Sequence, residues 1–524
     1  DALASNSAPS PASRTDALAS NSAPSPASRT DALEALAALS LAIDLANGAP
    51  EGTALRGTLV ALELAEDLGL SREVSGTTAF AALFRYLGCT SYAFEEARAL
   101  GDEHEAARIL APLDKADAVG IARAIATSLG ANDPWQARVA RGISLAVHGE
   151  AFRSGYEASH CEAAVLLAER LGASPAVCEA LAALHERWDG TGGPGKLRGD
   201  ALPLVTRIVQ VAREVTVLTA VSSAPPARAD VLRLLDARAG GQLDPALVAH
   251  IRGDGAARLV AALTVEPLWE TLVPRLAALA GALLMPRPGE IAEVFADFAD
   301  AKCPIFLGHS RAVAALVARA RPEDVTLQRA ALLHDLGRVA IPNRIWMTPG
   351  PLDRIARSRV DLHAAIGARL LAHEGISDRS VARRIGAHHG GGGGADAGIE
   401  ILQVADIAVA LGEARPQRPA FTDAARIDFL RSGARDGTLP AAAVATLVPL
   451  LAGGSRPPPA ILTPQERTVL ALVARGLSNK EVANSLGISA RTVQSHTIHA
   501  YDKLGIRTRA GAALRAMELG LLTP

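Results

Sequence analysis

The sequence predicts an all-α protein, built from two related helical modules and a short C-terminal helical domain. From Asp31 onward, apolar residues recur at helical spacing in segments rich in Ala, Leu and Val. Alternating β-branched runs are few, and aromatic residues make up only 3% of the chain. A length of 524 residues allows roughly three or four domains.

The composition is that of an ordinary globular protein. Charged residues make up 21% and hydrophobic residues 49%, and the formal net charge is −2. These values exclude a chain disordered throughout and a polycation that coats nucleic acid. The N-terminus lacks a signal-peptide layout, and no uncharged apolar run is long enough for a membrane helix. The four cysteines have no CxxC spacing, so neither a disulfide framework nor a zinc ribbon is indicated. We therefore expect a cytoplasmic protein with no membrane contact.

Two segments are predicted to lie outside the folded domains. Residues 1–15 are repeated identically as 16–30 and are rich in Ala, Ser and Pro, which indicates a disordered repeat or a tag over 1–30. A Gly/Pro linker over 451–460 contains three consecutive prolines, which cannot continue a helix. The linker separates the last domain, residues 461–524.

Between these segments lies an internal repeat. Residues 207–218 align with residues 400–411 at a constant offset of 193 (400 − 207). Upstream, His160 and His185 correspond to the regions of His363 and of His388–His389. We therefore expect two copies of one helical module at 31–250 and 296–450, joined by a helical connector at 251–295.

The C-terminal domain shows clear helix signals. Residues 463–466 (TPQE) form a capping box with proline at the first helical position, and residues 478–481 (SNKE) form a second one. Residues 487–489 (GIS) supply a tight turn and a new N-cap before an expected helix over 491–504. Two short helices joined by such a turn predict a helix-turn-helix.

Charge supports DNA binding by this domain. Residues 461–524 hold eight basic and four acidic residues, a local charge of +4, which leaves −6 for the rest of the chain (−2 − 4). The segment LTPQERTVLALVARGLSNKEVANSLGISARTVQSHTIHAYDKLGIRTRAGA resembles the LuxR-type DNA-binding domain over its whole length. The alternative is a four-helix structural cap with incidental charge. The resemblance implies double-stranded DNA as partner, major-groove contacts from Thr492, Gln494, Ser495 and His496, and phosphate contacts from Lys480, Arg491 and Lys503.

The second module carries a histidine-rich constellation. His334 and Asp335 end an apolar helix, where an ionisable pair is costly unless it is paired or binds metal. A lone buried histidine usually serves packing, but the recurrence of histidines and aspartates, one group per helix, favours a metal site. Imidazoles and shared carboxylates suit two adjacent divalent ions, with Asp335 as the bridge. The candidate ligands are His309, His334, Asp335, His363, His388, His389 and Asp406.

This order, H…HD…H…HH…D, resembles the HD superfamily of metal-dependent phosphohydrolases, and more narrowly the HD-GYP type that cleaves cyclic di-GMP. The resemblance implies two divalent metal ions (Mn, Fe or Mg) and a nucleotide or cyclic dinucleotide ligand. Arg338 stands where the family has a phosphate-contacting lysine, and Arg415 and Arg418 belong to a segment resembling its RPYR stretch. Asp335 and these three arginines are the expected catalytic and phosphate-binding residues. Ile305 replaces an acidic residue of some members, which favours two metals over three.

Each copy departs from the family pattern in its own way. After His389 the second copy has five consecutive glycines. His185 lies 28 residues before Arg213, whereas His389 lies 17 before Asp406, so about 11 residues of the GYP segment (28 − 17) are missing. Specificity for cyclic di-GMP is therefore not expected. The first copy keeps a similar segment over 185–194, but its HD position lies in 84–88 (FRYLG) and its last aspartate position is Arg213. Because arginines repel cations, we expect this copy to be non-catalytic. Its His160, His185 and Asp189 are then fold scaffolding, or its glycine-rich loop senses a ligand.

Three hypotheses of function follow. The first is a homodimeric transcriptional regulator of LuxR type whose HD module senses or hydrolyses a phosphate-containing nucleotide. The second is a metal-dependent phosphodiesterase localised by a DNA-binding tail. The third is a scaffold in which catalytically dead HD modules serve dimerisation.

Overall fold

The computed structural model describes residues 26–131, 133–221, 227–253, 255–280, 288–372, 379–390, 396–451 and 461–522. Over these ranges the regular structure is helical, with two isolated β-bridges and no β-strand, which confirms the all-α prediction. No helix in the described ranges is both long and apolar enough to span a bilayer. The four cysteines are all free.

The first module contains a long first helix and a cluster of shorter ones. Its helices are α1 (Pro26–Ala46), α2 (Thr53–Asp67), α3 (Arg72–Phe84), η1 (Cys89–Tyr92), α4 (Ala93–Leu100), α5 (Glu103–Leu110), α6 (Ala118–Thr127), α7 (Trp135–Arg170), α8 (Pro175–Ala182), η2 (Gly199–Ala201), α9 (Leu204–Val221), α10 (Arg228–Arg238) and α11 (Pro245–Ile251). Helix α1 begins five residues before the expected boundary at 31, because Pro26 can occupy the first turn of a helix. The rest of the predicted repeat, residues 1–25, lies outside the described residues.

The expected connector is helical and belongs to the first module by its contacts. It forms α12 (Gly255–Leu263) and α13 (Leu268–Ala278), and both helices pack against α2. Helix α13 also packs against α1. The connector is therefore part of the packed body rather than a free spacer.

The second module consists of α14 (Pro288–Asp300), η4 (Pro304–Phe306), α15 (His309–Ala320), α16 (Val325–Leu333), η5 (Leu336–Ala340), α17 (Asn343–Trp346), α18 (Arg354–Leu371), α19 (Arg379–Ala387), α20 (Ala397–Leu411), α21 (Asp423–Asp436) and α22 (Ala441–Leu451). Two details mark it as a copy of the first module. A Cβ on Gly88 would lie 1.9 Å from the His160 carbonyl oxygen, and one on Gly337 would lie 2.0 Å from that of His363. Each glycine thus permits the same close helix crossing.

A buried aspartate repeats in the same way. Asp44 accepts a hydrogen bond from the Ala54 amide, and Asp300 accepts one from the Ser310 amide, both at 2.9 Å. Both aspartates hold the first turn of a helix that follows a left-handed glycine. Thr53 in the first copy therefore occupies the position of His309 in the second.

The C-terminal domain has four helices, as expected: α23 (Pro464–Ala474), α24 (Asn479–Leu486), α25 (Ala490–Leu504) and α26 (Arg509–Glu518). Both predicted capping boxes are present, and Ser489 caps α25 by accepting a hydrogen bond from the Thr492 amide. Val469, Val482 and Val493 meet in its core.

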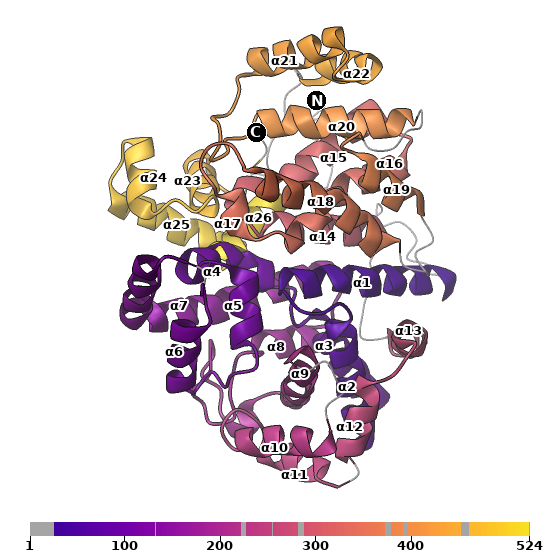
Figure 1. The fold of residues 1–524 in the computed structure, drawn as a ribbon, viewed down its shortest axis with the longest axis vertical. Coiled ribbons are helices and arrows are strands. Elements are labelled where there is room, and N and C mark those ends of the chain that lie inside the picture. The colour runs from indigo at the N-terminus through magenta and orange to yellow at the C-terminus, as the bar shows by residue number, and fades with distance from the viewer. Residues whose placement is uncertain are drawn as a thin grey trace, which may run out of the picture.

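The three parts form one packed body (Figure 1). The first module lies at the bottom of the view, the second at the top, and α23–α25 protrude at one side. Helix α1 runs along the boundary and contacts α2 and α13 below and α14 and α18 above. Helix α26 packs against α7, so the C-terminal domain is docked on the first module.

Candidate metal centre and DNA-binding surface

Five helices of the second module bring the seven predicted ligands together. His309 begins α15, His334 and Asp335 follow α16, and His363 lies in α18. The remaining ligands follow α19 or lie in α20: His388, His389 and Asp406. These side chains form two groups in which the ligand atoms lie within 4.8 Å of one another: His309, His334, Asp335 and Asp406, and His363, His388 and His389.

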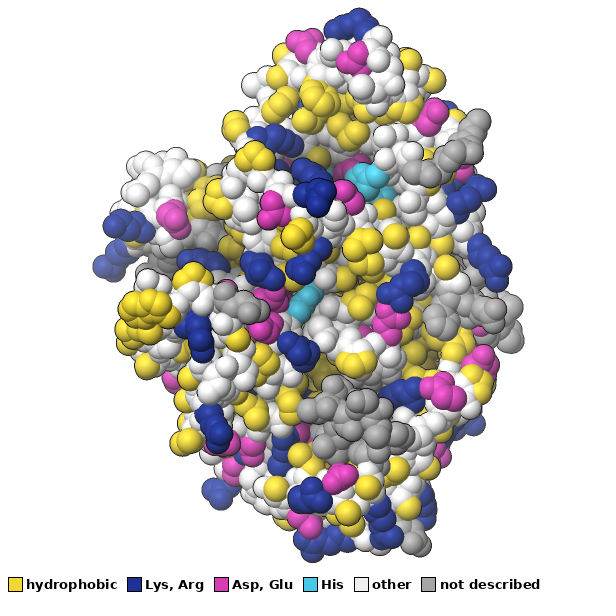
Figure 2. Space-filling view, viewed as in Figure 1, with side chains coloured by type: hydrophobic (Ala, Val, Ile, Leu, Met, Phe, Trp, Pro, Cys, Tyr) yellow, Lys and Arg dark blue, Asp and Glu magenta, His cyan; other side chains and the backbone are white. Residues whose placement is uncertain are grey.

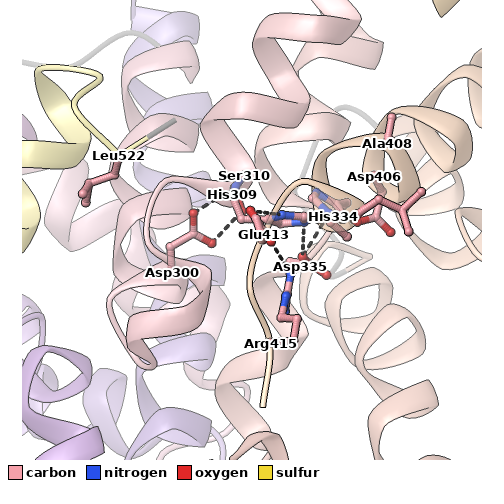
Figure 3. Close-up of polar contacts among 12 residues, drawn as sticks. Asp300, His309, Ser310, His334, Asp335, Asp406, Ala408, Glu413, Arg415 and Leu522 are labelled. Atoms are coloured by element: carbon pink, nitrogen blue, oxygen red, sulfur yellow. Dashed lines mark hydrogen bonds and ion pairs between the residues drawn. The ribbon is translucent and has the colours of Figure 1, made fainter. Parts of the chain in front are cut away.

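Asp335 lies between the two groups. Its Oδ2 is 3.3 Å from His309 Nε2 and 3.0 Å from His334 Nε2, whereas its Oδ1 is 3.2 Å from His363 Nε2. Asp406 Oδ1 closes the first group, 3.1 Å from His309 Nε2 (Figure 3). A carboxylate with one oxygen facing each group has the geometry of a bridge between two cations.

The histidines are oriented by hydrogen bonds on their other ring nitrogen. Nδ1 of His334 donates to the Ala331 carbonyl at 2.8 Å, and Nδ1 of His388 donates to the Ile385 carbonyl at 2.6 Å. His363 makes the same bond three residues back along its helix. Such bonds orient each ring so that Nε2 is aimed inward, as a metal-binding imidazole requires.

His309 is oriented by Glu413, which sequence reasoning missed. Glu413 Oε1 accepts from His309 Nδ1 at 2.9 Å and lies beside Arg415 (Figure 3). The only sequence signal for Glu413 is that it stands two residues before Arg415, in the segment predicted to bind phosphate. The carboxylate–imidazole pair makes Nε2 of His309 a stronger ligand.

The residues present fit two divalent ions. Nε2 of His334, Nε2 of His388 and both oxygens of Asp335 are buried and make no hydrogen bond of good geometry with a described residue, although Asp335 forms ion pairs with Arg338 and with the histidines. Buried polar atoms without partners are costly, and here they converge on common points. On the exposed side, His389 Nε2 lies 3.0 Å from His363 Nε2. These two imidazole nitrogens face the same point, where they share a hydrogen bond that a cation bound by both would replace.

The electrostatics of the first group favour a cation. Burial opposes protonation of His334, but Asp335 and Asp406 raise its pKa to about 9. Burial alone would raise the pKa of Asp335, yet Arg338 and the neighbouring histidines hold it well below its usual value. In the second group, burial and then the neighbouring imidazoles of His334 and His389 lower the pKa of His388 to about 3. The carboxylates of Asp335 and Asp406 thus attract a cation to the first group, and neutral imidazoles provide the candidate ligands of the second group.

Two of the three predicted phosphate-binding arginines flank the centre. Arg338 and Arg415 both contact the ring of Phe306, with their guanidinium carbons 4.4 Å and 4.7 Å from its centroid. Arg338 also forms an ion pair with Asp335, and Arg415 one with Glu413. Arg418 is placed differently: its guanidinium binds backbone carbonyls at the end of α20, including those of Leu411 and Glu413 at 3.1 Å. The structure therefore brings Arg338 and Arg415 to the site, and Arg418 to a helix end.

The glycine run after His389 lies largely outside the described residues, which end at Gly390 and resume at Asp396. In the first copy, the corresponding loop is held within its own module. Glu186 accepts from the Leu197 amide at 3.0 Å, and Asp189 accepts from the Thr191 amide at 2.9 Å.

The first copy has lost its metal ligands and gained cations. The equivalence of Gly88 with Gly337 places Arg85 at the position of His334 and Tyr86 at that of Asp335. Lys115, which the sequence did not single out, places its Nζ 2.9 Å from His185 Nδ1. His160, Cys161 and His185 lie close enough to share an ion, but a positively charged ammonium group already contacts one of the three.

The predicted DNA-contacting residues lie on α24 and α25. Lys480, Arg491, Thr492, Gln494 and Ser495 are exposed, whereas His496 is half-buried. Lys480 and Arg491 form no ion pair with any described residue. Figure 2 shows basic side chains along this protruding edge. The helix that would enter the major groove thus presents its N-terminal half to solvent.

Lys503 differs from the other predicted phosphate contacts. Its Nζ lies 2.8 Å and 2.7 Å from the two carboxylate oxygens of Glu466 in the α23 capping box. The ion pair ties α25 to α23. Lys503 is therefore already engaged within the domain.

Comparison with known families agrees with these features. Residues 460–516 match the family described as bacterial regulatory proteins, luxR family. Residues 306–420 and residues 104–247 each match the HD domain family. The chain therefore contains two HD domains followed by a C-terminal LuxR-type DNA-binding domain, which confirms the resemblance drawn from the sequence.

Individual relatives cover different parts of the chain. The 3′3′-cGAMP-specific phosphodiesterase 3 of Vibrio cholerae serotype O1 is 27% identical over 408 residues, which is 74% of this chain and 88% of that protein. A crystal structure of a V. cholerae cyclic GMP-AMP-specific phosphodiesterase (V-cGAP3) shares the fold, with a TM-score of 0.52 and 23% identity over 80% of this chain and 97% of that one.

The C-terminal domain has its own relatives. The transcriptional regulatory protein MctR of Rhizobium johnstonii is 44% identical over 62 residues, 12% of this chain and 29% of that protein. The transcriptional activator DevR/DosR of Mycobacterium tuberculosis is 37% identical over 89 residues, 17% of this chain and 41% of that protein. The similarity to these regulators is thus confined to the DNA-binding end.

Proposed function

We propose that this protein is a DNA-binding transcriptional regulator whose second HD domain binds two divalent ions and hydrolyses a phosphate ester of a nucleotide at a low rate. The observation that carries the proposal is the position of Asp335, with one oxygen facing each of two imidazole groups. Mn, Fe or Mg suits such a mixed nitrogen and oxygen ligand set. The homodimer and the domain boundaries given above remain predictions.

The chain's own residues would prepare the reaction. Two adjacent divalent ions, when bound, activate water and neutralise the charge of a phosphodiester. Arg415 and Arg338, stacked on Phe306, would hold the non-bridging phosphate oxygens through their planar guanidinium groups. His389 forms the open, solvent-exposed side at which a substrate would enter.

Arg338 also limits the rate. A guanidinium keeps its proton, so Arg338 cannot donate it to the leaving oxygen as a lysine can. General-acid help of this kind is worth typically 10²–10⁴-fold. We therefore expect slow turnover, and a simple phosphoester or nucleotide should be cleaved better than cyclic di-GMP.

The relative from V. cholerae makes 3′3′-cGAMP the first cyclic dinucleotide to test. The experiment is a turnover panel of bis(p-nitrophenyl) phosphate, 3′3′-cGAMP, cyclic di-GMP and linear nucleotides, with Mn²⁺ or Fe²⁺ and with a chelator. Metal-dependent hydrolysis that Asp335→Ala abolishes would support the proposal. Efficient and selective cleavage of cyclic di-GMP would contradict the expected specificity.

A second candidate function is ligand sensing without turnover. The ion pair between Arg338 and Asp335 favours this second function, because it joins the proposed phosphate-binding side chain to the proposed ligand of both metals. Bound metal and a bound nucleotide without any product in the same panel would select this candidate. Absence of metal in the purified protein would instead favour a scaffold role.

A further inference from the structure

A cavity of about 1570 Å³ lies inside the first HD copy, enclosed by the end of α1 and by helices α4 to α7. Ligand pockets commonly measure about 300–1,000 Å³, so this one has room for a lipid-sized molecule. Trp135 and Val139 line it and are 69% and 50% exposed, which places them at an opening.

The inner end of the cavity is the former metal site. Tyr86 and Arg213, which stand in place of Asp335 and Asp406, both line the cavity, and so does Lys115. The Lys115 ammonium contacts His185 Nδ1 at 2.9 Å and lies 5.3 Å from the Tyr156 ring centroid. Lys115 and Arg213 therefore bring positive charge to the region that corresponds to the candidate metal centre of the second copy.

These cations are not fully neutralised. Glu214 is shared between Arg213 and Arg238, so one carboxylate faces two guanidinium groups. Lys115 forms no ion pair with a carboxylate in the described part of the chain. The inner end therefore keeps a net positive charge.

Carboxyl groups in the wall do not cancel this charge. Burial raises the pKa of Glu96 to about 8, so Glu96 is mostly neutral at pH 7. Glu103 is paired with Lys302 at 3.2 Å. An anion is thus the chemical group that the inner end accommodates best.

The rest of the cavity is mainly apolar. Between α5, α6 and α7 most of its wall consists of aliphatic and aromatic side chains, among them Ile109, Leu110, Ile121, Ile125, Leu145 and Phe152. Arg108, Arg138, Glu150 and Arg153 also line it, and Arg153 is paired with Glu150. The apolar stretch of this wall suits a hydrocarbon chain better than the polar edges of nucleotide bases.

We propose that this cavity binds an amphipathic anion, with a carboxylate or phosphate monoester head at Lys115 and Arg213 and an apolar tail between α5, α6 and α7. The site is separate from the metal centre of the second copy, and it does not depend on the function proposed for that centre.

One helix connects this site to the DNA-binding domain. Helix α7 lines the cavity from Trp135 to Tyr156. Two turns further on, the carboxylate of Glu162 accepts hydrogen bonds from the amides of Arg507 and Thr508, at 2.6 Å and 2.9 Å. Glu162 thereby caps the start of α26. A ligand that shifts α7 therefore changes the contact that docks the DNA-binding domain.

The first test is direct binding to the full-length protein, measured by calorimetry with dodecanoate, dodecyl phosphate, dodecanol and 3′3′-cGAMP. We expect one dodecanoate or dodecyl phosphate per chain, and at least 10-fold weaker binding of dodecanol. Comparison of the two anions identifies the preferred head group. Lys115→Met should weaken dodecanoate binding at least 10-fold, whereas Lys196→Met, which removes an exposed lysine of the same module, should not.

A cavity-filling variant provides independent evidence. A Cβ on Gly149 would meet no atom within 4 Å, so Gly149→Phe fits the fold and places a ring in the cavity. This variant should lose dodecanoate binding. Equal affinity of wild type and Gly149→Phe, no binding of either anion, or binding of 3′3′-cGAMP that Lys115→Met removes would overturn the proposal.

The second test concerns the connection through α7. The affinity for a fluorescein-labelled 30-bp duplex is measured by anisotropy with and without saturating dodecanoate. We expect a change of at least threefold in the wild type and none in Glu162→Ala, which should still bind dodecanoate normally. Dodecanoate binding without any change in DNA affinity would refute the connection while leaving the ligand site intact.

Discussion

Replacement of Asp335 should empty both metal positions, because its two oxygens face different groups of histidines. The change to alanine leaves three donors on each side: His309, His334 and Asp406, and His363, His388 and His389. Loss of a residue that only supports a ligand commonly weakens metal binding about 10–100-fold. Loss of a shared ligand should cost each position at least about 100-fold. We expect close to two divalent ions per wild-type chain and fewer than half an ion in Asp335→Ala, since roughly 100-fold weaker sites lose metal during dialysis.

The assay is metal analysis by mass spectrometry after dialysis, with Asp189→Ala of the first copy as the matched control. Asp189 binds only neighbours in its own loop, so this variant should keep both ions. Because Asp335→Ala leaves Arg338 buried without its partner, Asp335→Asn serves as a second, isosteric variant, and circular dichroism checks folding. Equal metal content in wild type and both Asp335 variants would refute the bridging role.

The remaining predictions concern DNA, catalysis and stability. Lys480→Ala should weaken binding to all DNA sequences and lower the slope of log affinity against log salt concentration by about one unit. Gln494→Ala should instead alter sequence preference. A chain that lacks residues 461–524 and still binds DNA equally would contradict both expectations. Lys503→Ala should change the salt slope less than Lys480→Ala does, because Glu466 already holds Lys503. Arg338→Lys should raise turnover of bis(p-nitrophenyl) phosphate without creating a preference for cyclic di-GMP; unchanged turnover would argue against a missing general acid. Burial raises the pKa of Asp44 to about 8. Between pH 3.8 and about 8 the folded chain therefore keeps a proton that the unfolded chain has lost, and the free energy of unfolding falls as the pH rises through that range. Asp44→Asn should therefore gain Tm relative to wild type from pH 5 to pH 8, and a pH-independent difference would contradict this reasoning.

Local signals predicted the C-terminal domain well. The capping boxes at Thr463 and Ser478 are interactions within four residues, so their presence follows from the sequence alone and the structure confirms them. That the seven predicted ligand side chains cluster could also be predicted, since a buried polar group on each apolar helix needs a partner. Arg418 and Lys503 show the limit of such inference, because their carbonyl and carboxylate partners lie across a turn or on another helix.

The sequence by itself predicted the helical class, the duplication, the side chains that the fold gathers at the candidate metal centre, and the helix-turn-helix, because each depends on periodicity or short-range spacing. Only the tertiary structure decided which nitrogen of each histidine faces inward and that Glu413 supports His309, since these depend on side chains meeting from separate helices. It also decided that the first copy encloses a cavity with Lys115 at its inner end, and that Glu162 joins this copy to the DNA-binding domain. Lys115 precedes His185 by 70 residues and Glu162 precedes Thr508 by 346, and at such separations no local pattern specifies a contact; long-range packing does.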